Sequence, residues 1–134
     1  LTLRNLERVG GGMKIAFNQD LIQLADDESG LGSLTSVEGD LTFQANEALQ
    51  VTNGFTAKFQ TVGGSLVITD NNLLGDLYDL ENLYSVGGSL IITYNPLLSV
   101  CRAEDLDEFI EQVGADVDIG DNSPDYDPCY EELY

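Results

Sequence analysis

The sequence predicts a mainly β fold, a β-solenoid of about five coils that ends in a C-terminal cap containing a helix. A ten-residue block carries this prediction: it recurs five times, starting at residues 9, 37, 62, 86 and 113. Each copy has valine first, a glycine-rich or acidic stretch next, then an apolar-x-apolar stretch and a final asparagine. Repeats spaced by 20–50 residues are typical of solenoids, whose coils pack on their neighbours.

Each block contains a short strand, as the copy at 90–93 illustrates. Leu90 and Ile92 alternate there with Ile91 and Thr93, so the first pair is expected to point inward and the second pair outward. Ahead of this strand, apolar residues recur at every third position from 74 to 86, which suits 3₁₀ turns and extended corners better than a long helix. The glycine pairs 10/11, 63/64 and 87/88 fall at a corner, where we expect either positive φ or a close approach of two backbones.

The block ends in asparagine in every coil. Stacked coils would align these side chains in a ladder whose amides satisfy backbone groups at the turn leaving the strand. A polar ligand site is the alternative interpretation, but a ligand seldom needs a residue from every coil. We therefore expect a structural ladder of Asn18, Asn46, Asn71, Asn95 and Asn122.

Stacking in register also aligns the outward strand positions in columns. The first column contains Lys14, Thr42, Val67, Ile91 and Asp118. The second contains Ala16, Gln44, Thr69, Thr93 and Gly120. An apolar and aromatic patch with hydroxyls is typical of a binding surface, although β-branched residues on an exposed strand also occur without any ligand. The candidate partner-binding residues are Thr42, Val67, Thr69, Ile91, Thr93 and Tyr94.

The chain is strongly negative: it has 24 Asp and Glu but only 5 Lys and Arg, for a net charge of −19. This excludes nucleic acid as a partner, since phosphates need basic residues. No run of 18 apolar residues occurs, so we expect no membrane insertion in this segment. Cation binding, a cationic partner and a solvated surface adapted to salt remain as interpretations of the charge. The chain opens inside a repeat and without a signal peptide, which indicates a mature fragment or a piece of a longer protein.

The C-terminal part is expected to close the solenoid. Its two cysteines, Cys101 and Cys129, suggest one disulfide and an oxidising compartment, with two buried thiols as the alternative. Between them, apolar residues at helical spacing predict an amphipathic helix with Glu104 and Asp105 near its start. The apolar residues of that helix are Leu106, Phe109, Ile110 and Val113. The chain is thus predicted to be one domain, 1–134, with repeats over 1–98 and a capping region over 99–134. The N-terminal coil presents an open core and unpaired backbone, so association is expected there.

Acidic residues in the C-terminal part are candidates for a metal site. Five carboxylates occur within 116–127, and with backbone carbonyls they would suit Ca²⁺, the only cofactor that the sequence suggests. Their spacing differs from an EF-hand loop, and the outward side of a last strand is the alternative. The candidate ligands are Asp116, Asp118 and Asp121, followed by Asp125 and Asp127. The chain has no histidine and no G-x-S-x-G, HExxH or P-loop motif, so we expect no enzyme.

The repeat L-x-x-L-x-x-V-G-G-x-L-x-I-x-x-N resembles the receptor L-domain, a leucine-rich-repeat relative of growth-factor receptors, fungal cell-wall proteins and secreted bacterial surface proteins. The run from Asn95 through Ser99 and Cys101 to Asn122, Pro124 and Cys129 resembles the C-terminal cap of the bacterial surface members. The resemblance implies a right-handed β-solenoid with short parallel sheets, a Cys101–Cys129 bridge and a role in recognition or adhesion. It implies no common ligand, and the short chain with one cysteine pair departs from receptor ectodomains.

Two functions from different classes follow. The first is an extracellular, secreted or cell-surface module that binds a protein or glycan through its strand face without catalysis. The alternative is a structural spacer or stalk unit of a larger surface protein, with no ligand of its own. The first predicts that Ile91→Asp combined with Tyr94→Ala leaves folding intact and abolishes binding.

Overall fold

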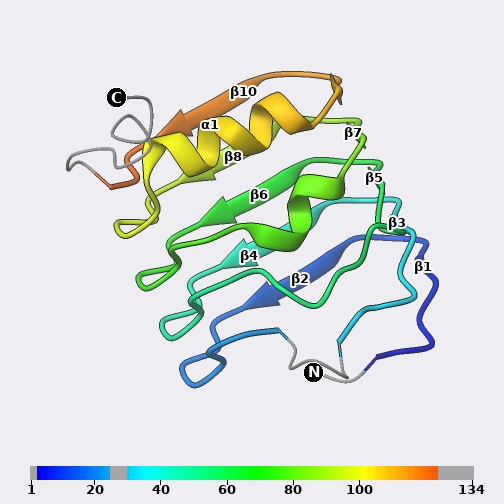
Figure 1. Cartoon of the computed structure of the whole chain (residues 1–134), viewed down its shortest axis with the longest axis horizontal. Helices are drawn as coiled ribbons and strands as arrows, with labels where there is room; N and C mark the ends of the chain where they lie inside the picture. Colours follow the sequence, from blue (N-terminus) through cyan, green and yellow to red (C-terminus); the bar gives the residue numbers. More distant parts are fainter. Residues whose placement is uncertain (1–2, 25–29, 124–134) are drawn as a thin grey trace.

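The computed structural model describes residues 3–24 and 30–123, and it contains two parallel sheets and one α-helix (Figure 1). One sheet has four-residue strands in the order β10-β8-β6-β4-β2. These strands are β2 (Met13–Ala16), β4 (Leu41–Gln44), β6 (Leu66–Thr69), β8 (Leu90–Thr93) and β10 (Val117–Gly120). The other sheet has two-residue strands in the order β1-β3-β5-β7-β9. These strands are β1 (Arg8–Val9), β3 (Ser36–Val37), β5 (Thr61–Val62), β7 (Ser85–Val86) and β9 (Gln112–Val113).

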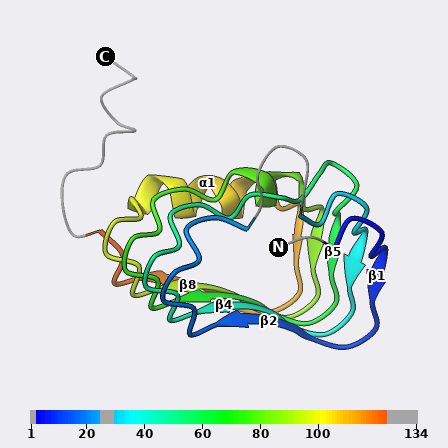
Figure 2. The same cartoon turned by 90° about the horizontal axis from the view of Figure 1, so that it is seen from below.

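The architecture is that of a β-solenoid, because each successive coil adds one parallel strand to each sheet. The predicted register is confirmed: Lys14, Thr42, Val67, Ile91 and Asp118 pair in one row across the long-strand sheet. Seen along the stack, the coils form a flattened ring (Figure 2). The long-strand sheet forms one side of this ring, and the short 3₁₀ helix η1 (Tyr78–Asn82) and helix α1 (Val100–Phe109) form the opposite side.

The core is a column of apolar side chains inside this ring. The inward strand residues Leu41 and Phe43 are fully buried, and so are their counterparts in β6 and β8. Between the strands, the residues predicted from three-residue steps are all buried, and the predicted 3₁₀ geometry is present at Leu80 in η1, with Leu77 and Leu83 as its caps. They are Leu74, Leu77, Leu80, Leu83 and Val86.

The glycine-rich corners bring successive coils close together. A Cβ on Gly87 would overlap the carbonyl oxygen of Gly63, and one on Gly63 would overlap that of Glu38. Each corner also donates to the coil before it, as when Gly87 N–H donates to the Val62 carbonyl over 2.8 Å. Of the two reasons that the sequence offered for these glycines, close approach is therefore confirmed, whereas positive φ among the described glycines occurs at Gly30 and Gly54.

The α-helix differs from its prediction. It starts at Val100, with Ser99 Oγ accepting from Arg102 N–H as N-cap, so Glu104 and Asp105 lie beyond its first turn. It ends at Phe109, and Val113 lies in β9. Ala103, Leu106 and Ile110 form the buried stripe, which leaves the Phe109 side chain on its flank and 53% exposed. The expected burial of Phe109 was therefore wrong.

The predicted cap is only partly within the described residues. Cys101 lies in α1 and is buried, but Cys129 lies outside the described residues, so the predicted disulfide stays a prediction. Among the described segments, no helix is long and apolar enough to span a membrane.

Candidate functional site

A left-handed residue ends each long strand. Residues with φ between 53° and 59° occupy this position in all five coils, and none of them is glycine. They are Phe17, Ala45, Asp70, Tyr94 and Asp121. For residues with a Cβ this conformation costs about 1–2 kcal/mol. It redirects the chain after the outward-facing strand residue, so that the next residue, always asparagine, turns inward.

The asparagines form the expected ladder. From Asn46 onward, each Oδ1 accepts both the backbone N–H and the Nδ2 of the asparagine one coil earlier. For Asn71 Oδ1 and Asn46 these distances are 3.2 and 3.1 Å. Each following Nδ2 also donates to a strand carbonyl of the coil before, as Asn71 Nδ2 does to Phe43 O over 3.1 Å. The middle members, Asn46, Asn71 and Asn95, are completely buried, so the ladder is part of the core and not a polar ligand site.

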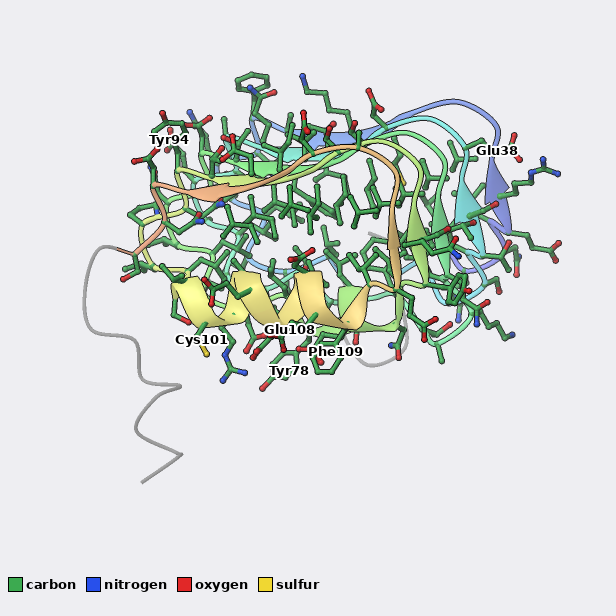
Figure 3. All side chains as sticks on the ribbon, turned by 90° about the horizontal axis from the view of Figure 1, so that it is seen from above. Glu38, Tyr78, Tyr94, Cys101, Glu108 and Phe109 are labelled. Atoms are coloured by element: carbon green, nitrogen blue, oxygen red, sulfur yellow. The ribbon has the colours of Figure 1, made fainter. Side chains whose placement is uncertain are left out.

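The outward face of the long-strand sheet is the candidate binding surface, which we call the strand face. Figure 3 shows Tyr94 on this side of the molecule, whereas Tyr78, Phe109 and Glu108 lie on the opposite side with α1. Val67 and Ile91 pair directly across β6 and β8 and are half-buried. Tyr94 stands beside them with 57% of its surface exposed.

The predicted patch exposes fewer of its side chains than expected. Thr93 lies in the outward row next to Thr69, and their hydroxyl oxygens are 3.2 Å apart. Thr93 is only 8% exposed, so it supports the face and does not present a free hydroxyl as predicted. Thr69 also donates to the Asp70 carboxylate over 3.0 Å. It is half-buried, as are Thr42, Val67 and Ile91, and Tyr94 is the exposed member of the patch.

One exposed aromatic residue of this face was missed. Phe17 occupies the left-handed position of the first coil and is 69% exposed. The ammonium group of Lys14 lies 5.7 Å from the centre of its ring, within the range of a cation–π interaction. A left-handed turn is usually glycine or asparagine, so the sequence alone gave Phe17 and Tyr94 no fixed direction.

The calcium site predicted at the acidic residues near β10 stays a prediction. Asp118 lies in the extended strand β10, Asp116 directly precedes that strand, and Asp121 follows it in the left-handed conformation. Within 3–24 and 30–123, no group of three or more Asp, Glu, Cys or His side chains could hold a metal ion. Asp118 instead continues the outward row that contains Ile91, as the alternative interpretation required. Asp125 and Asp127 lie outside the described residues.

A second group of acids lies where η1 meets α1. The pKa of Glu81 is raised above its ordinary value of 4.5, first by desolvation and then by Asp76, Asp105 and Asp79, while Arg102 opposes the shift. This side also carries the exposed rings of Tyr78 and Phe109. The sequence analysis assigned no site to these residues, because only the fold brings η1 and α1 together.

No protein-family model matches the chain, and no solved structure gives a significant match.

Proposed function

We propose that the chain is an extracellular recognition or adhesion module that binds a protein or glycan through the strand face, without catalysis. The observation that carries this proposal is the pair of exposed aromatic side chains at left-handed turns, Phe17 and Tyr94. Asparagine or glycine would adopt this conformation at lower cost, so the aromatic residues bring strain without burial. Contact with a partner gives such exposed rings a role, because aromatic residues dominate binding surfaces.

The surrounding residues suit this role. Val67 and Ile91 provide a small apolar centre, and Thr42, Thr69 and Asp70 surround it with polar groups. The row of backbone-paired strands beneath them fixes these side chains before any partner arrives, which lowers the entropy cost of binding. The resemblance to the receptor L-domain supports the same assignment, and with it a right-handed solenoid at a cell surface.

The proposal includes a Cys101–Cys129 bridge in the cap. Alkylation of the purified protein with iodoacetamide in denaturant without reductant is expected to leave both cysteines unmodified, whereas reduction first should allow both to be modified. Alkylation of both before reduction would contradict the bridge and the oxidising compartment that it implies.

Variants of the strand face test the binding function. Asp118 is the neighbour of Ile91 in register, so Ile91→Asp would place two carboxylates side by side and weaken the fold. Ile91→Lys avoids this repulsion. We expect Ile91→Lys combined with Tyr94→Ala to keep the circular dichroism spectrum and to reduce binding in a glycan-array and cell-surface screen by at least about 100-fold, as is typical of hot-spot residues.

The matched control lies on the opposite side of the ring. Tyr78→Ala combined with Phe109→Ala removes two equally exposed rings and should leave binding unchanged. Equal loss of binding in both double variants would contradict a site on the strand face. If the wild-type chain binds nothing in the screen at low and at high salt, the spacer function replaces the proposal.

A further inference from the structure

The N-terminal coil leaves one end of the core column incompletely covered. Its inward residues Val9, Met13 and Ile15 are half-buried, whereas their counterparts Val37, Leu41 and Phe43 in the next coil are fully buried. A hollow of about 390 Å³ lies beside this strand. Its lining residues are Lys14, Ile15, Ala16, Asn18 and Leu21.

The backbone of β2 is paired on one side only. It is the terminal strand of its sheet, and the N–H groups of Met13 and Phe17 donate to Asp40 and Gln44 in the second coil over 2.8 and 3.0 Å. Because successive N–H groups of a strand point to opposite sides, those of Lys14 and Ala16 point away from β4. They form an open parallel edge.

The asparagine ladder determines which hydrogen-bonding groups a neighbour at this edge must offer. Every Oδ1 from Asn46 onward accepts from the asparagine of the coil before it. At the first coil, Asn18 Oδ1 occupies this accepting position, and the described residues place no further ladder asparagine beyond it. A neighbour that docks at this end needs donors for Asn18 Oδ1. A second copy that docked with its own N-terminal coil would place oxygen against oxygen.

The glycine corner points to the same kind of neighbour. Gly63, Gly87 and Gly114 are in close contact with the preceding coil, and a Cβ on any of them would overlap a carbonyl oxygen. Gly10 stands in the same column, but a Cβ on Gly10 or Gly11 would meet nothing within 4 Å. The first coil thus has a corner without side chains, and no described segment packs against it. Glu38 is the exception in this column, and its carboxylate pairs with Arg8 of the first coil.

We propose that the N-terminal coil is a docking surface for one further coil of this repeat. The added strand runs parallel to β2 and takes the backbone groups of Lys14 and Ala16. Its asparagine donates from the backbone N–H and from Nδ2 to Asn18 Oδ1. Its chemistry is that of the coils already present, with the pattern apolar-x-apolar-x-x-Asn.

An extended chain tests this docking. Residues 3–9 match 80–86, so residue 1 corresponds to residue 78, and a second copy of 54–77 placed directly before residue 1 supplies one coil in phase. We expect the amide hydrogens of Lys14 and Ala16 to exchange at least about 100-fold more slowly in the extended chain, because they become internal to the sheet. Unchanged exchange of both amides would overturn the proposal.

Two variants of the extended chain separate docking from a non-specific effect of the added segment. Replacing the ladder asparagine of the added coil by alanine should reduce the protection of Lys14 and Ala16. Gly10→Val with Gly11→Val should abolish it by blocking the corner, while leaving the stability of the unextended chain unchanged. Full protection in the valine variant would contradict the proposed stacking. Protection that rises with protein concentration in the unextended chain would show that a second copy fills the surface instead.

Discussion

At the scale of the residue, the buried asparagines explain how a narrow core can contain five sharp turns. A turn between strand and loop leaves backbone groups without a sheet partner, and in the buried interior these groups need partners from the protein itself. The side chain of each asparagine carries both donors and acceptors, and the middle members of the ladder use them with the coils on either side. The ladder thus stabilises the solenoid and does not bind a ligand.

If the ladder stabilises the fold, removing the Asn71 side chain should lower the stability strongly. Asn71→Ala removes the acceptor of Asn46 N–H and Nδ2 and the donor to Phe43 O, all in a fully buried position. We expect the free energy of unfolding in urea to fall by about 3 kcal/mol, the cost of leaving buried polar groups without partners. The next residue, Asn72, is exposed, so Asn72→Ala should change it by less than about 0.5 kcal/mol. Similar losses in the two variants would refute the role of the ladder.

Glu81 makes the stability depend on pH. Its pKa is raised in the folded protein, mainly by desolvation, so the native state holds this proton more tightly than the unfolded state does. The charged form of Glu81 therefore destabilises the fold, and the loss develops as the pH rises from 4.5 through the raised pKa. We expect Glu81→Gln to raise the midpoint of thermal unfolding at pH 7 but not at pH 3. Glu47→Gln, at an exposed turn, removes the same charge and should give a smaller rise at pH 7. A rise for Glu81→Gln that is equally large at pH 3 would contradict this explanation.

The sequence predicted the inward strand residues, but not the left-handed turns or the burial of Thr93. The repeat predicted which strand residues face inward, because a period of two leaves no other choice once one face is apolar. It did not predict the left-handed turns, since Phe17 and Tyr94 are poor candidates by local preference and only the inward asparagine that follows requires the conformation. The burial of Thr93 could not be predicted either, because it depends on neighbours in other coils.

At the scale of the element, the corner between the short and the long strand sets the distance between coils. The glycines there have no side chain to separate successive backbones, and their N–H groups donate to the coil before. Gly87→Ala would place a methyl group against the carbonyl of Gly63, and we expect it to lower the free energy of unfolding by about 2 kcal/mol through overpacking. Gly75 has its nearest neighbour, the Leu97 carbonyl, 4.0 Å from an added Cβ, so Gly75→Ala serves as the tolerated control. A harmless Gly87→Ala would mean that the corners can separate freely.

Helix α1 shows what an element-level pattern can and cannot predict. Apolar spacing predicted a helix in this segment, and one is present. The boundaries were wrong because Ser99, a good N-cap, starts the helix earlier than the acidic residues suggested. Val113 followed the helical spacing, but its place as the valine of the fifth block assigns it to β9, and the repeat prevails over the local pattern.

At the scale of the whole molecule, the net charge of −19 opposes the compact fold. Within 3–24 and 30–123, the one ion pair joins Arg8 and Glu38 at the surface, so few acids are compensated by direct contact. Salt supplies the missing compensation, since the Debye length falls from about 30 Å at 0.01 M to about 3 Å at 1 M. We therefore expect the midpoint of thermal unfolding to rise by roughly 5 °C or more between these salt concentrations, a shift that corresponds to about 1 kcal/mol for a domain of this size.

A charge variant distinguishes screening from a general effect of salt on hydrophobic burial. Glu47, Glu104 and Glu108 are exposed, and their replacement by lysine changes the net charge by six, from −19 to −13. If self-repulsion limits stability, this triple variant unfolds at a higher temperature than the wild type in 0.01 M NaCl, and the two converge in 1 M NaCl. If instead salt acts through burial alone, both proteins gain equally and the difference between them stays constant, which would contradict self-repulsion as the cause.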